Sequence, residues 1–225
     1  MTTAPPWRLR PSPALATALS LALLLLWDAA GLDLPITTSF ASAQGFSLRE
    51  HWLLTRVLHD GARLLAFALV LWVLLSIWKP LGVLRRLERR ERIWLLAVTA
   101  GGMLLVSVLK RFTLTSCPWD LQQFGGAARY LSHWAWGQRD GGPGHCFPAG
   151  HASAALAWVA GYFAFRGRDG RIAWTWLALA LAAGVVLGLS QQLRGAHYAS
   201  HTLWTAWLCW TWAWLWSGLL RRGRA

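Results

Sequence analysis

Six long apolar stretches, separated by polar segments, constrain this chain more than any other feature of its sequence. They lie near residues 13–31, 60–78, 93–109, 151–166, 173–190 and 200–219. A helix needs about 20 residues to cross the hydrocarbon core of a bilayer, and each stretch approaches or reaches that length. Hydrophobic residues make up 56% of the chain and charged residues only 14%, which argues against a water-soluble globule. We therefore expect an all-α bundle of six transmembrane helices that forms a single domain over residues 1–225.

The basic residues predict how this bundle is oriented, because segments rich in Lys and Arg stay in the cytoplasm during insertion. Such residues precede the first stretch, join the second to the third and the fourth to the fifth, and follow the sixth. They are Arg8 and Arg10; Lys79, Arg85, Arg86, Arg89, Arg90 and Arg92; Arg166, Arg168 and Arg171; and Arg221, Arg222 and Arg224. Both termini are therefore expected in the cytoplasm. The net charge of +13 follows from this topology, and we expect no nucleic-acid partner.

The first apolar stretch has a second interpretation as a signal peptide. Arg8 and Arg10 precede it, and "ASAQ" at 41–44 offers small residues with the spacing of a cleavage site. Cleavage normally occurs within a few residues of the apolar run, whereas Ala43 lies well beyond Trp27. We favour a retained first helix.

Two connections on the outer side are long. Residues 32–59 contain "GFSLREHWLLTRVLH", which predicts an amphipathic helix lying on the membrane surface as a lip for the substrate. Residues 110–150 are polar and rich in glycine, and a loop of this length is expected to carry function. Cys117 and Cys146 in this loop could form a disulfide outside the cytoplasm, a pairing that the sequence leaves open, while Cys209 is expected to fill apolar space.

Three segments bring unusual polar residues to the outer ends of apolar stretches. They are "LKRFTLTSCPWD" after the third stretch, "CFPAGHAS" before the fourth and "RGAHYASH" before the sixth. A helix that starts near Gly150 presents free N–H groups and the positive end of its dipole, which favours an anion. Lys110, Arg111 and Arg194 could neutralise the oxygens of a phosphate there.

His197 and His201 stand at positions i and i+4 and are expected on one helix face, where one ring can act on a substrate and the other can support it. An imidazole can attack phosphorus and pass the phosphoryl group to water, provided that another group protonates the leaving oxygen. His151 is the available acid. Structural roles are expected for most of the Trp residues, as an aromatic belt, and for Arg129, Arg139, His133 and His145.

The three segments resemble the type 2 phosphatidic acid phosphatase family, whose pattern is K-x6-R-P, then P-S-G-H, then S-R-x5-H-x3-D. This chain has Lys110 to Pro118, "PAGH" at 148–151 and "SQQLRGAHYASH" at 190–201. The resemblance implies a six-helix membrane enzyme with an outward-facing site. It also implies that His197 is the nucleophile, His151 the general acid and Lys110 a phosphate ligand, with the amide of Gly150 completing the cradle.

The chain departs from this pattern at four positions. Cys117 and Gln191 replace the two arginines, Ala149 replaces the serine, and His201 replaces the aspartate that orients the nucleophile. Each lost arginine removes a charge-assisted contact worth about 1.5–3 kcal/mol, for which Arg111 and Arg194 are expected to compensate. Asp120 is expected to supply the missing negative charge within a hydrogen bond, or one water, of His197 or His201.

We expect an enzyme that hydrolyses a lipid phosphate or pyrophosphate monoester at the outer face of a bacterial inner membrane, without cofactor or metal. A lipid phosphoryl transferase would use the same histidines, and a catalytically inactive relative would bind anionic lipid headgroups instead. A metalloenzyme with zinc on His197, His201 and either His145 or His151 is a weaker interpretation, since "HYASH" lacks the Glu of "HExxH". The sequence does not select the lipid or the oligomeric state.

Overall fold

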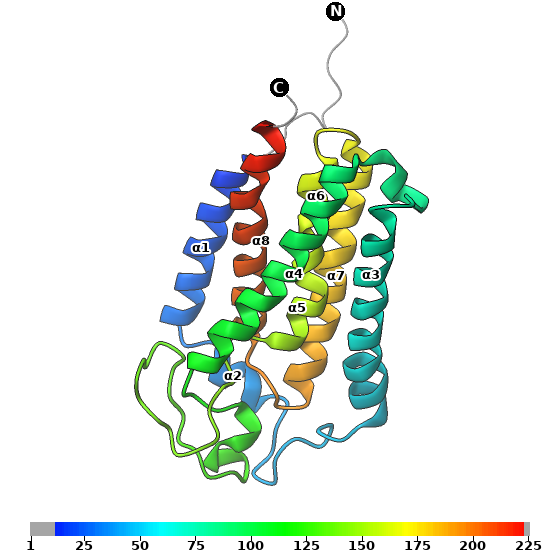
Figure 1. Ribbon diagram of the computed structural model, residues 1–225. Coiled ribbons are helices and arrows are strands. Elements are labelled where there is room, and N and C mark those ends of the chain that lie inside the picture. The colour runs from blue at the N-terminus through cyan, green and yellow to red at the C-terminus, as the bar shows by residue number, and fades with distance from the viewer. Residues whose placement is uncertain (1–11, 223–225) are drawn as a thin grey trace, which may run out of the picture.

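The computed structural model describes residues 12–222, and these residues form a bundle of helices (Figure 1). Arg8, Arg10 and Arg224, used above to predict orientation, lie outside the described residues. The helices are α1 (Pro13–Ala29), α2 (Asp33–Thr38), α3 (Ala62–Ser76), α4 (Arg89–Phe112), α5 (Gly150–Leu156), α6 (Ala160–Phe165), α7 (Gly170–Leu193) and α8 (Ala199–Arg222). A π-helical segment, η2 (Leu53–Gly61), leads directly into α3, and a 3-10 turn, η6 (Ala157–Val159), joins α5 to α6.

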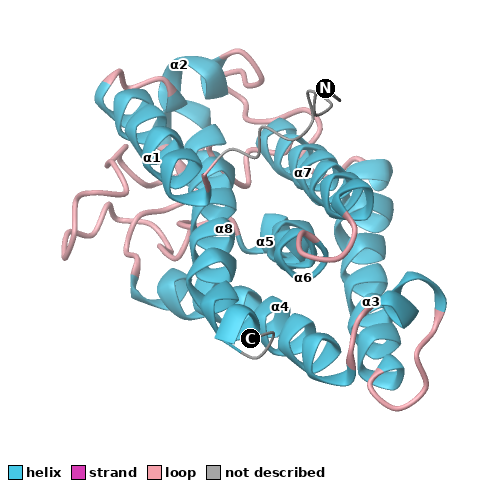
Figure 2. Cartoon of the chain, turned by 90° about the horizontal axis from the view of Figure 1, so that it is seen from above, coloured by secondary structure: helices cyan, strands magenta, loops and turns pink. Residues whose placement is uncertain are grey.

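The centre of the bundle is formed by α5 and α6. Figure 2 shows these two helices surrounded by α3, α4, α7 and α8, with α1 on the outside against α8. Every residue of α6 is buried, and α5 buries Ala152, Ser153, Ala155 and Leu156. Small residues dominate these two helices, so the surrounding helices can approach them closely.

The expected fold class is confirmed: the described residues form an all-α bundle of the multi-pass membrane type, in which each predicted span coincides with a helix or a pair of stacked helices. By length and composition alone, Leu53–Ser76, Arg89–Phe112 and Gly170–Leu193 could cross a membrane, and Pro13–Ala29 is a shorter apolar helix. The amphipathic helix expected within residues 32–59 is not an independent element. Its second half is η2, which leads directly into α3, because the apolar residues there continue into the second span.

The fourth span is interrupted at η6 although it contains no proline. The indole Nε1 of Trp176, on α7, donates to the backbone oxygen of Trp158 at 2.8 Å. In a regular α-helix that oxygen accepts from the N–H four residues later, so a side chain that captures it distorts the backbone ladder. A Cβ added to Gly161 would lie 2.1 Å from the same Nε1, and this glycine therefore makes room for the indole.

The two ends of the bundle differ in charge. Figure 1 shows α1, α4 and α7 beginning at one end, where α6 and α8 finish. At that end Arg168, between α6 and α7, binds Glu91 of α4 at 2.6 Å, and Glu91 is fully buried. The long loops, the end of α4 and the beginnings of α5 and α8 lie at the opposite end, which carries the predicted site.

Candidate active site

His197 lies in the turn between α7 and α8 and has only 2% of its surface exposed. Its Nδ1 is 3.4 Å from Nδ1 of His201 and 3.7 Å from Sγ of Cys146. Burial lowers the pKa of His197 well below its ordinary value, and the positive charge of Lys110 lowers it further. The ring is therefore neutral near pH 7, as a nucleophile requires, and its Nε2 is the nitrogen left to meet a substrate.

The expectation that His197 and His201 share one helix face is wrong. Helix α8 begins at Ala199, so that His201 lies in its first turn and His197 precedes it. The carboxylate of Asp33 determines this start, because its Oδ1 accepts from the backbone N–H of Ser200 at 3.0 Å. Gly195 turns the chain with φ of +74°, and a Cβ there would lie 2.4 Å from the ring of Phe46. The rings of His197 and His201 are therefore brought together by the turn at Gly195 and by the cap that Asp33 forms at the start of α8.

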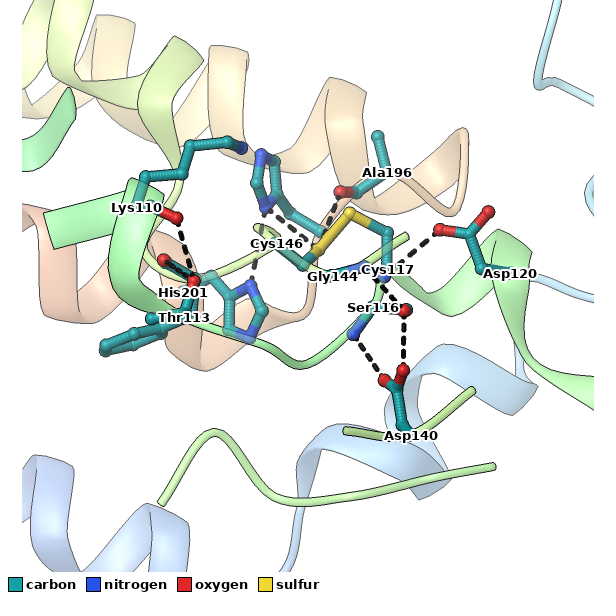
Figure 3. The surroundings of a disulfide bond; sticks show 12 residues. Lys110, Thr113, Ser116, Cys117, Asp120, Asp140, Gly144, Cys146, Ala196 and His201 are labelled. Atoms are coloured by element: carbon teal, nitrogen blue, oxygen red, sulfur yellow. Dashed lines mark hydrogen bonds between the residues drawn. A yellow bond between two sulfur atoms is a disulfide. The ribbon is translucent and has the colours of Figure 1, made fainter. Parts of the chain in front are cut away.

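Lys110, from α4, is half-buried and packs against the beginning of α5. A Cβ added to Gly150 would lie 3.7 Å from Cδ of Lys110, so the lysine stem runs beside the first residue of that helix. In Figure 3 the side chain of Lys110 lies on the same side of the disulfide as His201. The structure does not bring Arg111 to the same place: it is exposed, because successive residues leave an α-helix about 100° apart.

His151 follows Gly150 in the first turn of α5, with its ring centroid 6.5 Å from that of His197. On its other side it packs against His59 of η2, with centroids 3.9 Å apart. Nδ1 of His59 lies 2.9 Å from Oδ1 of Asp60. Nδ1 of His151 is buried without a hydrogen-bond partner among the described residues. The imidazoles of His59 and His151 therefore lie together at the position for which the sequence predicted a single general acid, His151.

Arg194 is the C-cap of α7 and therefore belongs to a different helix from His201, which lies in α8. It is 9% exposed. Its Nη1 donates to Oε1 of Gln191 at 3.2 Å and its Nε donates to the backbone oxygen of Arg49 at 2.8 Å. The charge of Arg194 acts on His151, together with those of Lys110 and Arg63. Gln191 thus orients an arginine that lies beside the cluster.

Cys117 and Cys146 form a disulfide, with their Cα atoms 5.1 Å apart (Figure 3). Cys117, at the position where the resembled pattern has an arginine, is therefore part of a covalent bridge. The bridge ties the segment after α4 to the segment before α5. Cys209 is buried and unpaired.

Asp120 does not reach the histidines. Its Oδ2 accepts from the backbone N–H of Cys117 at 3.3 Å, and Asp120 and His201 lie on opposite sides of the disulfide in Figure 3. The expected hydrogen bond from Asp120 to His197 or His201 is therefore absent from the structure. The carboxylate stabilises its own tight turn, which a residue three positions after Cys117 is well placed to do.

Two histidines without an assigned role, His59 and His133, lie beside the predicted site residues. His133 has its ring centroid 5.6 Å from that of His201. The predicted topology places both at the same end of the bundle as Lys110, His151 and His197, and this is the signal in the sequence that could have singled them out. In the part of the chain that is described, the groups close enough to share a metal ion are Cys117, Cys146 and His197, which includes the disulfide, and Asp28, Asp33 and His133. The zinc ligands of the weaker interpretation, His197 and His201 with His145 or His151, are not among these groups.

Comparison with known proteins identifies the family of this chain. A family model described as the PAP2 superfamily matches residues 92–224, more than half of the chain and the part that contains Lys110, His151 and His197. The crystal structure of "the first transmembrane PAP2 type phosphatidylglycerolphosphate phosphatase from Bacillus subtilis" is similar, with a TM-score of 0.56 at 17% identity, over 93% of this chain and 96% of that chain. No curated protein matches. The chain belongs to the PAP2 superfamily.

Proposed function

We propose that this chain is an integral membrane phosphatase that hydrolyses the phosphate or pyrophosphate monoester of a lipid through a phosphohistidine intermediate on His197. One observation carries the proposal. Lys110, His151 and His197 come from three distant parts of the chain and gather at one end of the bundle around a buried, neutral imidazole. A structural role for each residue alone does not account for their meeting.

The geometry suggests how the reaction proceeds. Nδ1 of His197 faces His201, so its Nε2 attacks phosphorus while the bond from phosphorus to the leaving oxygen breaks. His151 gives its proton to that oxygen. Water then attacks the phosphohistidine, His151 takes back a proton, and inorganic phosphate leaves. Lys110, Arg194 and the amide of Gly150 are proposed to bind the phosphate oxygens in both steps.

An apolar groove supports a lipid as the substrate. It has a volume of 660 Å³ and runs between η2, α3, α5 and α7. Val57, Leu58 and Gly61 line it on either side of His59 in the sequence, and Ala154 and Ala155 line it one turn beyond His151. Pockets that bind small-molecule ligands typically have volumes of about 300–1,000 Å³. A tail in this groove would place its phosphate ester at the pair of imidazoles.

The distribution of charge supports a site on the outer, periplasmic face of a bacterial inner membrane. The basic segments 85–92 and 166–171 lie at the end of the bundle opposite the histidines (Figure 1). Basic segments are retained in the cytoplasm, which would direct His151 and His197 outward. The disulfide at the same end suits an oxidising compartment.

The test is phosphate release from a panel of lipid phosphates and pyrophosphates by purified protein in detergent. Wild type should release phosphate in a vanadate-sensitive manner, and His197→Ala should not. His51→Ala is the matched control, since His51 is exposed and stacks on Trp52 away from the cluster. Rapid quenching with labelled substrate should trap an acid-labile phosphoprotein in wild type only. Lipid binding without turnover by wild type would overturn the proposal in favour of an inactive relative, and dependence on added metal would favour a metalloenzyme.

A further inference from the structure

His201 occupies the position at which the family pattern has an aspartate, so the support of His197 lacks a negative charge in its immediate neighbour. A neutral imidazole can fix the tautomer of His197 but cannot balance the positive charge that forms on it. Asp120 does not fill this role, because it caps a turn on the far side of the disulfide. The carboxylates of Asp28 and Asp33, from the first two helices, lie instead beside His133, whose ring contacts that of His201.

Asp28, at the end of α1, and His133, in the loop between α4 and α5, form a buried pair. Oδ2 of Asp28 lies 3.3 Å from Nε2 of His133, and their side chains are only 8% and 5% exposed. The same oxygen accepts from the indole N–H of Trp134 at 2.9 Å and from that of Trp204 at 2.8 Å. Two donors that point at one oxygen are typical of an ionised carboxylate held in a defined orientation.

His133 connects this carboxylate to the catalytic cluster. Its ring stacks on Phe147, with centroids 4.3 Å apart and an interplanar angle of 8°. The edge-to-face contact with His201 has a centroid distance of 5.6 Å and an angle of 86°. His201 in turn contacts His197 through the two Nδ1 atoms, 3.4 Å apart. A continuous series of contacts therefore runs from Asp28 through His133 and His201 to His197.

We propose that Asp28 and His133 are positioning residues, which hold His201 in place and supply from outside α8 the negative charge that its own sequence lacks. This inference rests on the proposed function, since it assumes that His197 is the nucleophile. The inference adds no covalent step to the proposed mechanism. When Nε2 of His197 bonds to phosphorus and the leaving oxygen takes the proton of His151, the ring of His197 gains positive charge. The carboxylate of Asp28 stabilises that charge through His133 and His201.

The charge state of the pair is consistent with this role. Burial lowers the pKa of His133, although the nearby Asp28 opposes the shift, so His133 is neutral and the pair has a net negative charge. Charges interact over longer distances in a protein interior than in water. Asp33 lies close to the pair of Asp28 and His133, but its oxygens accept hydrogen bonds from Ser200 and from the indole of Trp27. We therefore assign the positioning role to Asp28.

The first experiment compares Asp28→Asn and His133→Phe with wild type. Asn keeps an oxygen for the two indoles, and Phe keeps the stack on Phe147, so both variants should fold. We expect kcat and the rate of phosphoenzyme formation to fall about tenfold or more, with KM changed less than about twofold. Asp120→Asn is the control, because Asp120 lies away from the histidines, and it should match wild type. Equal activity of Asp28→Asn and Asp120→Asn would overturn the inference.

The second experiment places an acid at position 201. In a His201→Asp background the charge no longer has to come from Asp28, so Asp28→Asn should cost much less than in wild type. If the losses of activity caused by His201→Asp and Asp28→Asn are additive, the inference is overturned. It is also overturned if purified wild type contains a stoichiometric metal ion that Asp28→Asn removes, because Asp28, Asp33 and His133 would then form a metal site. If His197→Ala releases phosphate as fast as wild type, the proposed function itself has failed, which distinguishes the two ideas.

Discussion

The imidazole rings of His59 and His151 pack against each other with centroids 3.9 Å apart, although the two residues begin different spans. Oδ1 of Asp60 lies 2.9 Å from the Nδ1 of His59. The side chain of His59 is 25% exposed, and its neighbours Leu58 and Gly61 line the apolar groove. His59 thus stands where the tail of a lipid would meet its phosphate ester, beside the proposed acid.

On the proposal that His59 assists the leaving group, His59→Phe should reduce kcat about tenfold, because Phe keeps the packing against His151 but removes both ring nitrogens. Steady-state phosphate release from the best lipid of the panel measures the effect. His51→Phe, at an exposed position, is the control. Unchanged turnover in His59→Phe would show that this ring only fills space.

Arg194→Ala should reduce kcat/KM about tenfold or more, since a buried guanidinium beside His151 contributes a charge-assisted contact to the phosphate. Arg129→Ala should have no effect, because Arg129 is exposed in the outer loop. Both variants are assayed with the same lipid. Losses of similar size would contradict a phosphate-binding role for Arg194.

The disulfide predicts a thiol count. Denatured, unreduced protein should show one free thiol, that of Cys209, and reduced protein should show all three cysteines. A bridge across 29 positions contributes about 3.5 kcal/mol by restricting the unfolded chain, so reductant should lower the midpoint of thermal unfolding. Activity should fall with it, because Cys146 Sγ lies 3.7 Å from His197 Nδ1. Three thiols before reduction would contradict the pairing.

Gly161→Ala should destabilise the bundle by about 1–3 kcal/mol, because the new methyl group would overlap the indole of Trp176. Gly218→Ala is the matched control on α8: a Cβ there meets nothing within 4 Å, and alanine favours a helix by about 1 kcal/mol over glycine. Thermal unfolding in detergent compares the two. A lower midpoint for Gly218→Ala than for Gly161→Ala would show that the packing between α6 and α7 is misassigned.

The positions of the spans and the grouping of Lys110, Gly150, His151 and His197 could be predicted from the sequence. Apolar length determines which segments cross a membrane, and topology then places the polar ends of those segments on one side. Spacing along the chain also directed attention to Cys117 and Cys146, whose pairing needed a distance. These features depend on local composition and on how many spans separate two segments, because an even or odd number of crossings decides whether they lie on the same side. Both can be read from the sequence.

Only the tertiary structure decided which carboxylate lies beside His133 and how the imidazole rings meet. Asp28 and Asp120 both lie at the end of the bundle that carries the histidines, but α1 packs against α8 and brings Asp28 to His133, while Asp120 accepts a hydrogen bond within its own tight turn. Asp33 likewise starts α8 after His197, so the two imidazoles meet across a turn. Contacts of this kind depend on how helices pack side by side. For residues far apart in the chain, the separation in sequence does not predict which helices pack against each other.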